Sequence, residues 1–310
     1  MAYINRREFI KRASGLGALA FGISAVGPGF IASAMADSLS STPSEIAVIR
    51  NGSPAQMVQK AFEMLGGIEK YVKKGHSVVV KPNIGWDRRP EQGANTEPEI
   101  VAEVVRLCLK AGAAKVKVFD RTCANARRCY RNSGIENAAK AAGADVKHVF
   151  MKRFKQVNIP NGKVIKSWEF YKDALDADVF INLPAAKHHS LSSVSLALKN
   201  MMGILGGERG ELHNNFPEKI TDINTVIKPQ ITILDAVRIL MRNGPQGGNL
   251  ADVKQANTII ASVDQVAIDS YGATLFGLKA SDIAHIRAAY ERGLGEMDLN
   301  KVVVKEVNLS

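Results

Sequence analysis

The chain has 310 residues, of which 46% are hydrophobic and 23% are charged, so it is unlike disordered or fibrous proteins. Three cysteines are too few for a disulfide framework or for the four thiolates of a 4Fe-4S cluster, which we therefore do not expect. The net charge is +11, but aromatic residues are only 6% and no nucleic-acid-binding motif occurs, so the charge favours a small anionic ligand over nucleic acid.

The first 36 residues have the three-part layout of an export signal. Arg6 and Arg7 begin an R-R-x-F-I-K motif, residues 13–31 carry no charge, and two A-x-A cleavage sites end at Ala34 and Ala36. This layout resembles the twin-arginine signal, whose proteins cross the membrane already folded. We therefore expect a periplasmic or other extracytoplasmic location, with the twin-arginine translocase as a partner during export. An N-terminal membrane anchor is the alternative, although the many glycines disfavour a stable membrane helix.

A polar linker at 37–44 precedes a segment in which strand and helix patterns alternate. This alternation predicts one α/β domain over 45–310, with a mostly parallel sheet, helices on both faces and one lobe or two. The expected strands are 45–50, 77–82, 115–120, 145–150, 178–182, 231–235, 258–262 and 301–307, with a hairpin within 157–170. The expected helices are 54–65, 98–110 with Thr96 as its cap, 135–142, 193–202, 219–227, 264–276 and 281–292.

Charged residues and glycines follow several of the expected strands. Because parallel strands deliver their carboxyl ends to one edge of a sheet, we expect these residues to lie together. Asp87, Arg89 and Arg121 are candidate substrate-binding residues, since arginine pairs well with carboxylate or phosphate. Gly244 is a candidate for close backbone approach to the substrate. Asp235 is a candidate catalytic residue that orients a histidine, holds a metal or caps a turn.

The densest group of chemically active residues lies between 187 and 213. We expect a loop with Lys187, His188 and His189, followed by a helix with Lys199, whose positive charges suit an anion. His189 and Lys199 are candidate catalytic residues, because histidine transfers protons near neutral pH, and Lys187 is a candidate substrate-binding residue. His188 and His213 are candidate ligands of a divalent metal. A structural histidine and an exposed lysine are the alternatives.

Two of the three cysteines, Cys123 and Cys129, lie near each other in the chain. They could form a disulfide in an oxidising compartment, bind a metal or remain free, and the sequence favours none of these.

Four motifs together resemble one prokaryotic family, the domain of unknown function 362. They are V-V-K-P-N at 79–83, D-V-F-I-N-L-P with K-H-H at 178–189, L-A-L-K-N-M-M-G at 196–203, and I-L-D-A at 233–236. The resemblance covers essentially residues 45–310. Many members carry ferredoxin-like cysteine motifs, which are missing here, so the resemblance implies a fold but neither a cluster nor a reaction.

A second pattern is similar to the nickel-dependent lactate racemase family. His189 and Lys199 are ten residues apart, and Asp87 and Arg89 occupy a similar loop. By this resemblance, His189 would be an acid or base, Lys199 would hold the metal-bearing cofactor and His213 would be a metal ligand. The glycines before the lysine of that family are absent here, so the resemblance concerns fold ancestry more than chemistry.

These features together predict an exported enzyme that acts on a small carboxylate or phosphate. The alternative is a non-catalytic periplasmic binding protein or a cofactor-handling partner of a redox system. Binding proteins use lysine and arginine as readily as enzymes do, but they have less need of His189 and Asp235. A racemase-like metal-cofactor enzyme is a third, weaker reading.

Overall fold

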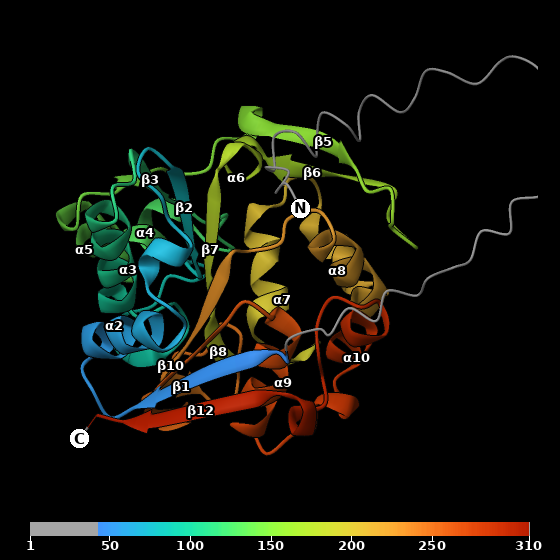
Figure 1. The fold of residues 1–310 in the computed structure, drawn as a ribbon. Helices are drawn as coiled ribbons and strands as arrows, with labels where there is room; N and C mark the ends of the chain where they lie inside the picture. Colours follow the sequence, from blue (N-terminus) through green and yellow to red (C-terminus); the bar gives the residue numbers. More distant parts are fainter. Residues whose placement is uncertain (1–42, 310) are drawn as a thin grey trace, which may run out of the picture.

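A ten-stranded mixed β-sheet runs through the computed structural model, which describes residues 43–309 (Figure 1). The expected signal at 1–36 and most of the linker lie outside the described residues. The strands follow the order β12-β1-β11-β10-β7-β2-β3-β4, with β8 beside β10 and β9 beside β8. Their bounds are β1 Glu45–Arg50, β2 Ser77–Pro82, β3 Lys115–Val118, β4 Asp145–Val146, β7 Val179–Leu183, β8 Ala185–His189, β9 Ser193–Ser195, β10 Ile231–Leu240, β11 Val253–Ser262 and β12 Val303–Asn308.

The sheet is mostly parallel, as predicted. Among the described strands, β11 runs antiparallel to β1 and β10, and β9 runs antiparallel to β8. Strands β10, β7, β2, β3 and β4 are all parallel neighbours, so their carboxyl ends reach one edge of the sheet. Lys81 and Thr232 both pair with Asn182 at this edge.

Helices cover both faces of the sheet, also as predicted. Along β2, Val78 and Val80 pack on one face and Val79 on the other, because successive side chains of a strand alternate. Helices α2, α3 and α5 cover the first face, and α8, α9 and α10 cover the second (Figure 1). The bounds are α2 Pro54–Met64, α3 Pro98–Lys110, α4 Ala126–Asn132, α5 Ile135–Ala141, α6 Lys172–Asp176, α7 Ala197–Asn200, α8 Phe216–Asn224, α9 Gln265–Thr274 and α10 Ala284–Glu291.

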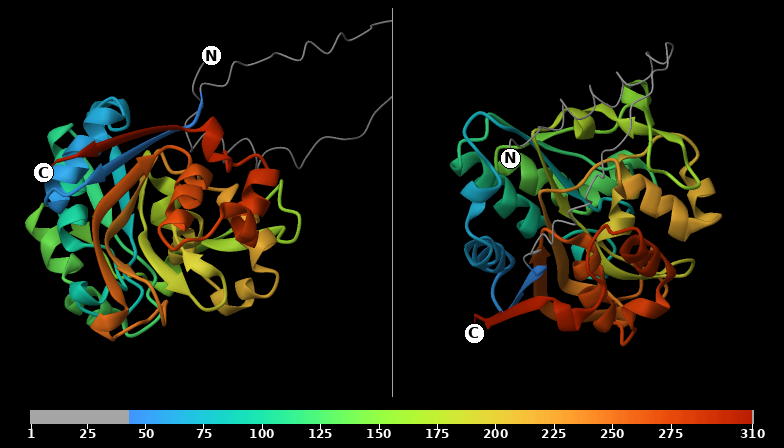
Figure 2. Two further views of the ribbon diagram at one scale, coloured as in Figure 1. Left: turned by 90° about the horizontal axis from the view of Figure 1, so that it is seen from below. Right: turned by 45° about the vertical axis from the view of Figure 1, so that its right-hand side comes forward.

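The two ends of the described chain meet in the sheet. Strand β1 lies between β12 and β11, in parallel register with the former and antiparallel to the latter (Figure 2). A separate hairpin of β5 Phe154–Asn158 and β6 Ser167–Tyr171 lies outside the main sheet, and it extends beyond both ends of the segment 157–170 where a hairpin was expected. Within residues 43–309, none of the helices has both the length and the apolar character needed to cross a bilayer.

Three local predictions were wrong. Residues 187–189 form the end of β8 rather than a loop, and 193–202 begin as β9 before the short α7 and a 3₁₀ turn. Thr96 does not cap α3, because its hydroxyl donates to the carbonyl oxygen of Leu183 and accepts from the amide of Asn83. The contact with Leu183 joins the loop after β2 to the end of β7.

Candidate functional site

A cleft of about 580 Å³ opens beyond the carboxyl ends of β2, β3 and β8. It is also lined by α7 and by the 3₁₀ segment that ends at His213. Its wall contains five basic side chains, two acidic ones and two histidines. These are Lys81, Arg121, Lys187, Lys199, Arg209, Asp120, Glu208, His189 and His213.

Lys81 forms an ion pair at the base of the cleft. Its Nζ lies 3.0 Å from Oδ1 of Asp120 and donates to Oδ1 of Asn200 over 2.7 Å. Oδ2 of Asp120 accepts from the amide of Ile84 over 2.6 Å. Burial lowers the pKa of Lys81, and the charge of Asp120 opposes this shift. The charge of Lys81 is therefore matched within the protein.

Lys187 is buried without a carboxylate partner in the described part of the chain. It projects from β8, and its Nζ donates to Oδ1 of Asn83 over 2.8 Å and to the carbonyl oxygen of Ala94 over 2.5 Å. Burial lowers its pKa to about 8. Carbonyl oxygens stabilise an ammonium group but do not cancel its charge, so Lys187 keeps an unmatched charge at neutral pH.

Lys199 has apolar and neutral surroundings. Its Nζ lies 3.2 Å from Nε2 of His213, 3.8 Å from the sulfur of Met202 and 4.1 Å from the centre of the Phe216 ring. Burial lowers its pKa to about 7, and the charge of Lys187 contributes in the same direction. The group therefore exchanges a proton near neutral pH.

The hydrogen bonds of the two cleft histidines define their neutral tautomers. Nδ1 of His189 accepts from the amide of Leu191 over 3.1 Å, which leaves its proton on Nε2. Nδ1 of His213 donates to the carbonyl oxygen of Gly210 over 3.2 Å, so its Nε2 accepts from Lys199. The two rings stack with centres 5.8 Å apart. Burial lowers the pKa of His189 to about 3, so it stays a neutral hydrogen-bond donor.

Two arginines shape the wall of the cleft. Arg121 donates to the carbonyl oxygens of Leu205 and Gly207, both over 2.9 Å. Arg209 donates to the carbonyl oxygens of Arg121 and Thr122, both over 2.8 Å. Arg121 comes from the loop after β3 and donates to the segment 205–209, and Arg209 donates back to the loop after β3. These hydrogen bonds link the two segments.

Two of the expected binding residues, Asp87 and Arg89, lie outside the cleft lining. The carboxylate of Asp87 accepts from Asn132 over 2.6 Å and pairs with Arg128 over 2.6 Å. Arg89 is exposed at the start of a 3₁₀ turn. Trp86 takes their place in the lining.

Asp235, Gly244 and His188 also face structural partners rather than the cleft. Oδ2 of Asp235 accepts from the amide of Glu97 at the start of α3 over 2.7 Å, and burial raises its pKa to about 7. The amide of Gly244 donates to Nδ1 of His188 over 3.2 Å. A Cβ at Gly244 would lie 2.0 Å from the carbonyl oxygen of His188, so only glycine fits against this strand.

The site also contains residues that the sequence analysis did not select. Asn200 and Arg209 line the cleft. Asn200 directly follows Lys199 in a motif already noted, so its position was a usable signal. Arg209 lies in a polar loop without a pattern of its own, and only the fold brings it to the cleft.

A family model described as "Domain of unknown function (DUF362)" matches residues 78–274. The chain belongs to this family. The thylakoid-associated protein sll1697 of Synechocystis sp. is 28% identical over 251 residues, which cover 78% of this chain and 76% of that protein.

Two solved structures match this DUF362 chain at low similarity. The lactate racemase apoprotein from Thermoanaerobacterium thermosaccharolyticum is 10% identical with a TM-score of 0.44, and the match covers 76% of this chain and 57% of that one. A protein from Thermotoga maritima is 11% identical with a TM-score of 0.43, and the match covers 77% and 60% of the two chains. This chain thus spans less than two thirds of either structure.

Metal-binding groups are dispersed in the described part of this DUF362 chain. Within residues 43–309, no three or more His, Cys, Asp or Glu side chains gather in a way that could hold a metal ion. His188 accepts from Gly244 on the far side of β8, whereas His213 contacts Lys199. The two histidines therefore do not meet.

The cysteines are unpaired. Cys108 and Cys129 are buried, and Cys123 is exposed and lines the cleft. Of the three states left open by the sequence, the described structure lacks the disulfide between Cys123 and Cys129.

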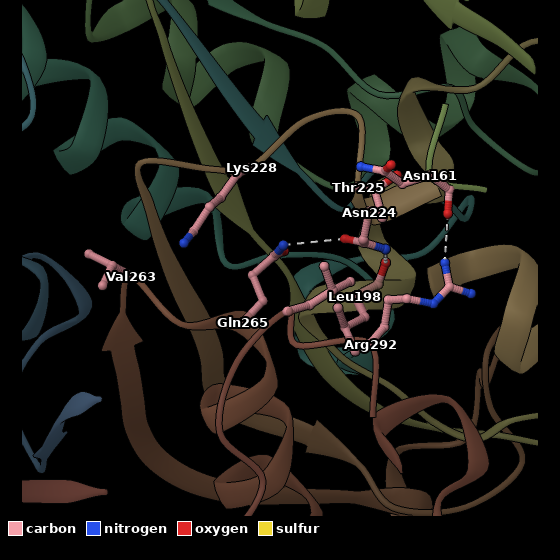
Figure 3. Close-up of a pocket in the computed structure, with 9 residues that line it drawn as sticks. Asn161, Leu198, Asn224, Thr225, Lys228, Val263, Gln265 and Arg292 are labelled. Atoms are coloured by element: carbon pink, nitrogen blue, oxygen red, sulfur yellow. Dashed lines mark hydrogen bonds between the residues drawn. The ribbon is translucent and has the colours of Figure 1, made fainter. Parts of the chain in front are cut away.

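A second cavity, of about 370 Å³, borders the short helix α7, which also lines the cleft (Figure 3). Leu198 of α7 lines this cavity, whereas the next two residues line the cleft. A chain of buried amides connects the two. Asn200 donates to Asn182 over 2.8 Å, Asn182 to Gln265 over 3.0 Å, and Gln265 to Asn224 over 3.3 Å. Because Lys81 donates to Asn200, the chain reaches from the second cavity to the base of the cleft.

Proposed function

We propose that this DUF362 chain is an exported enzyme that binds a small carboxylate or phosphate in the cleft and transfers a proton on it. The observation that carries the proposal is the pair of buried lysines, Lys187 and Lys199, neither of which contacts a carboxylate in the described structure. Unmatched buried charge is unfavourable, and a bound anion would compensate it.

Proton transfer is supported by the contact between Lys199 and His213. The amine exchanges a proton near neutral pH, and Nε2 of the imidazole is an acceptor 3.2 Å away. His189 supplies an N–H that can stabilise negative charge as it develops on a substrate oxygen. A protein that only binds an anion needs the lysines, but it needs neither the contact between Lys199 and His213 nor the N–H of His189.

Export is supported by Arg6 and Arg7 and by the uncharged segment after them. The name of the Synechocystis relative concerns thylakoid association, and it adds only that one similar protein works at a membrane.

The non-catalytic alternative, a binding or cofactor-handling partner of a redox system, shares the anion site. The two are distinguished by incubating the protein with lactate or pyruvate in heavy water. An enzyme that moves a proton exchanges a C–H of the ligand for deuterium, which nuclear magnetic resonance detects. A binding protein returns the ligand without exchange.

Anion binding is tested by calorimetry with phosphate, lactate and pyruvate at pH 7. We expect Lys187→Met to weaken binding by about tenfold or more, because a hydrogen bond to a charged group is worth about 1.5–3 kcal/mol. Lys152→Met is the matched control, because Lys152 is exposed and outside the cleft lining. Wild-type protein that binds none of the three anions would contradict the proposal, as would equal effects of the two substitutions.

A further inference from the structure

We propose that Lys199 is a carbonyl-reactive amine, which forms an imine with the carbonyl carbon of a small 2-oxo carboxylate bound in the cleft. This inference rests on the proposed function and narrows its substrate class from small anions to carboxylates with an adjacent carbonyl group.

The surroundings of Lys199 favour an amine over an ammonium ion. The side chain is buried, and its nitrogen contacts an imidazole, a thioether and an aromatic face instead of a carboxylate. The Phe216 face, the acceptor nitrogen of His213 and the charge of Cys123 favour the charged form, but the loss of hydration on burial is the largest effect. Burial in an apolar pocket and a nearby cation are the two ways in which proteins convert lysine into a nucleophile.

The other two lysines of the cleft lack this property. Lys81 is held as a cation by the carboxylate of Asp120. Lys187 donates two of its three N–H groups to carbonyl-type oxygens, which stabilise the charged form and leave the third N–H for a ligand. Lys187 is therefore suited to hold a carboxylate, and Lys199 is the lysine suited to react.

The contacts of the two lysines permit both roles at once. Burial lowers the pKa of both, but only Lys187 donates to carbonyl-type oxygens that stabilise its ammonium group. Lys187 is therefore the better-stabilised cation, and Lys199 loses its proton more readily. One lysine can then bind the carboxylate of the ligand while the other attacks its carbonyl group.

The neighbouring histidines complete the set of groups that imine formation requires. His213 has an acceptor nitrogen beside the amine, so it can take the proton that the amine loses as the C–N bond forms. His189 carries its proton on Nε2 and can donate to the carbonyl oxygen. Both proton-handling groups line the cleft with Lys199.

The proposed step is a condensation without redox change. The lone pair of Nζ forms a bond to the carbonyl carbon, and the π electrons of the C=O bond move to oxygen, which is protonated. Two protons leave nitrogen, the C–O bond breaks, and one water molecule is released for each imine formed. The C=N bond then withdraws electrons from the next carbon, where a C–H bond becomes easier to break.

Borohydride trapping tests the inference. The full-length protein is incubated with pyruvate, reduced with sodium borohydride, and examined by intact and peptide mass spectrometry. We expect one reduced adduct per chain, located on Lys199. Lactate carries the same carboxylate without the carbonyl and should give no adduct.

Three variants make the assignment specific. Lys199→Arg should reduce trapping to the level seen with lactate, and Lys152→Arg, at an exposed lysine, should leave it unchanged. Lys199→Met serves as a second loss variant, and circular dichroism verifies that each variant is folded. Trapping spread over surface lysines, or undiminished in folded Lys199 variants, would overturn the inference.

The same samples separate this inference from the proposed function. If calorimetry shows pyruvate and lactate binding but no adduct forms, the imine is wrong and the anion site stands. If phosphate, lactate and pyruvate all fail to bind and no adduct forms, both fail. A trapping yield that rises as the pH increases through about 7 supports an amine with the lowered pKa of Lys199.

Discussion

Buried ionisable side chains without partners make the stability of this protein depend on pH. His285 on α10 is 2% exposed, its ring packs edge-on against Phe216, and its Nε2 has no hydrogen-bond partner in the described structure. Burial lowers its pKa to about 3. The folded state therefore keeps this imidazole neutral under conditions in which an exposed histidine would be charged.

The first prediction concerns His285→Leu. Below about pH 6.5, His285 is protonated in the unfolded chain, whereas in the folded protein it stays neutral down to about pH 3. The free energy of unfolding therefore decreases as the pH falls from 6.5 toward 3. From pH 7 to pH 5 the wild type should lose ~2 kcal/mol more unfolding free energy than the variant. Urea unfolding at both values measures this difference. The burial of His189 has an effect of the same sign, but it is present in both proteins and cancels. Equal losses would show that His285 is protonated in the folded state.

At the scale of elements, the short helix α7 is held by the amide chain between the two cavities. Every amide in this chain donates in the same direction, starting from Lys81, which strengthens successive hydrogen bonds. Asn182 is fully buried in the middle of the chain, on β7. Its side chain therefore couples the sheet edge to the position of Asn200 and, through it, to Lys81.

The second prediction is that Asn182→Leu lowers the unfolding free energy by ~2–4 kcal/mol. It leaves the acceptor of Gln265 buried without its donor, and it leaves the side-chain donor of Asn200 only a longer contact of 3.4 Å with the carbonyl oxygen of Lys81. Denaturant unfolding measures the change. Thr232→Val is the matched control, since Thr232 pairs with Asn182 across the sheet and its buried hydroxyl has no partner among the described residues. That substitution should change stability by less than about 1 kcal/mol. Similar losses in the two variants would mean that packing, not the amide chain, stabilises this region.

The same region shows how far the sequence determines the fold. Strand β2 was predictable because Val78, Val79 and Val80 form a β-branched run. Strand β8, with the sequence A-A-K-H-H, has no such signal and is a strand because it pairs with β10 and β9. Helix α7 spans only four residues, too few for a periodic pattern. Tertiary contacts therefore decide the structure of the segment that carries the cleft lysines.

The sequence predicted where the cleft lies in the fold, but not all of the residues that line it. The rule that ligands bind beyond parallel strand ends selects the edge at which the cleft opens, and Lys187, His189 and Lys199 all line that cleft. It does not say which way a side chain points. Asp235 was expected at the end of a strand, but β10 continues to Leu240 and Asp235 accepts from the amide of Glu97 at the start of α3, while Asp87 pairs with Arg128. Local hydrogen-bond partners, which a single sequence does not reveal, decide between these outcomes.

At the scale of the whole molecule, the sheet joins the two ends of the described chain. Strand β1 pairs with β12 and β11, so its place in the sheet is completed only after the last strand has been synthesised. A fold with such long-range pairing forms slowly and is not complete while the chain is still emerging. The proposed export route, which accepts folded proteins, would suit this topology, and Arg6 and Arg7 begin the motif that resembles its signal.

The third prediction is that replacing Arg6 and Arg7 together with lysine leaves the uncleaved precursor in the cytoplasm. The substitution preserves the charge of the segment, so a loss of export would reflect recognition of the guanidinium pair rather than electrostatics alone. Arg12→Lys is the matched control, because Arg12 follows the R-R-x-F-I-K motif in the same charged region and its replacement should leave export unchanged. Cell fractionation with immunoblotting of precursor and mature forms measures the outcome. Export of the double variant at the wild-type level would show that the protein leaves the cytoplasm by a pathway that does not recognise the two arginines. The late pairing of β1 with β12 would then no longer be linked to the export of a folded protein.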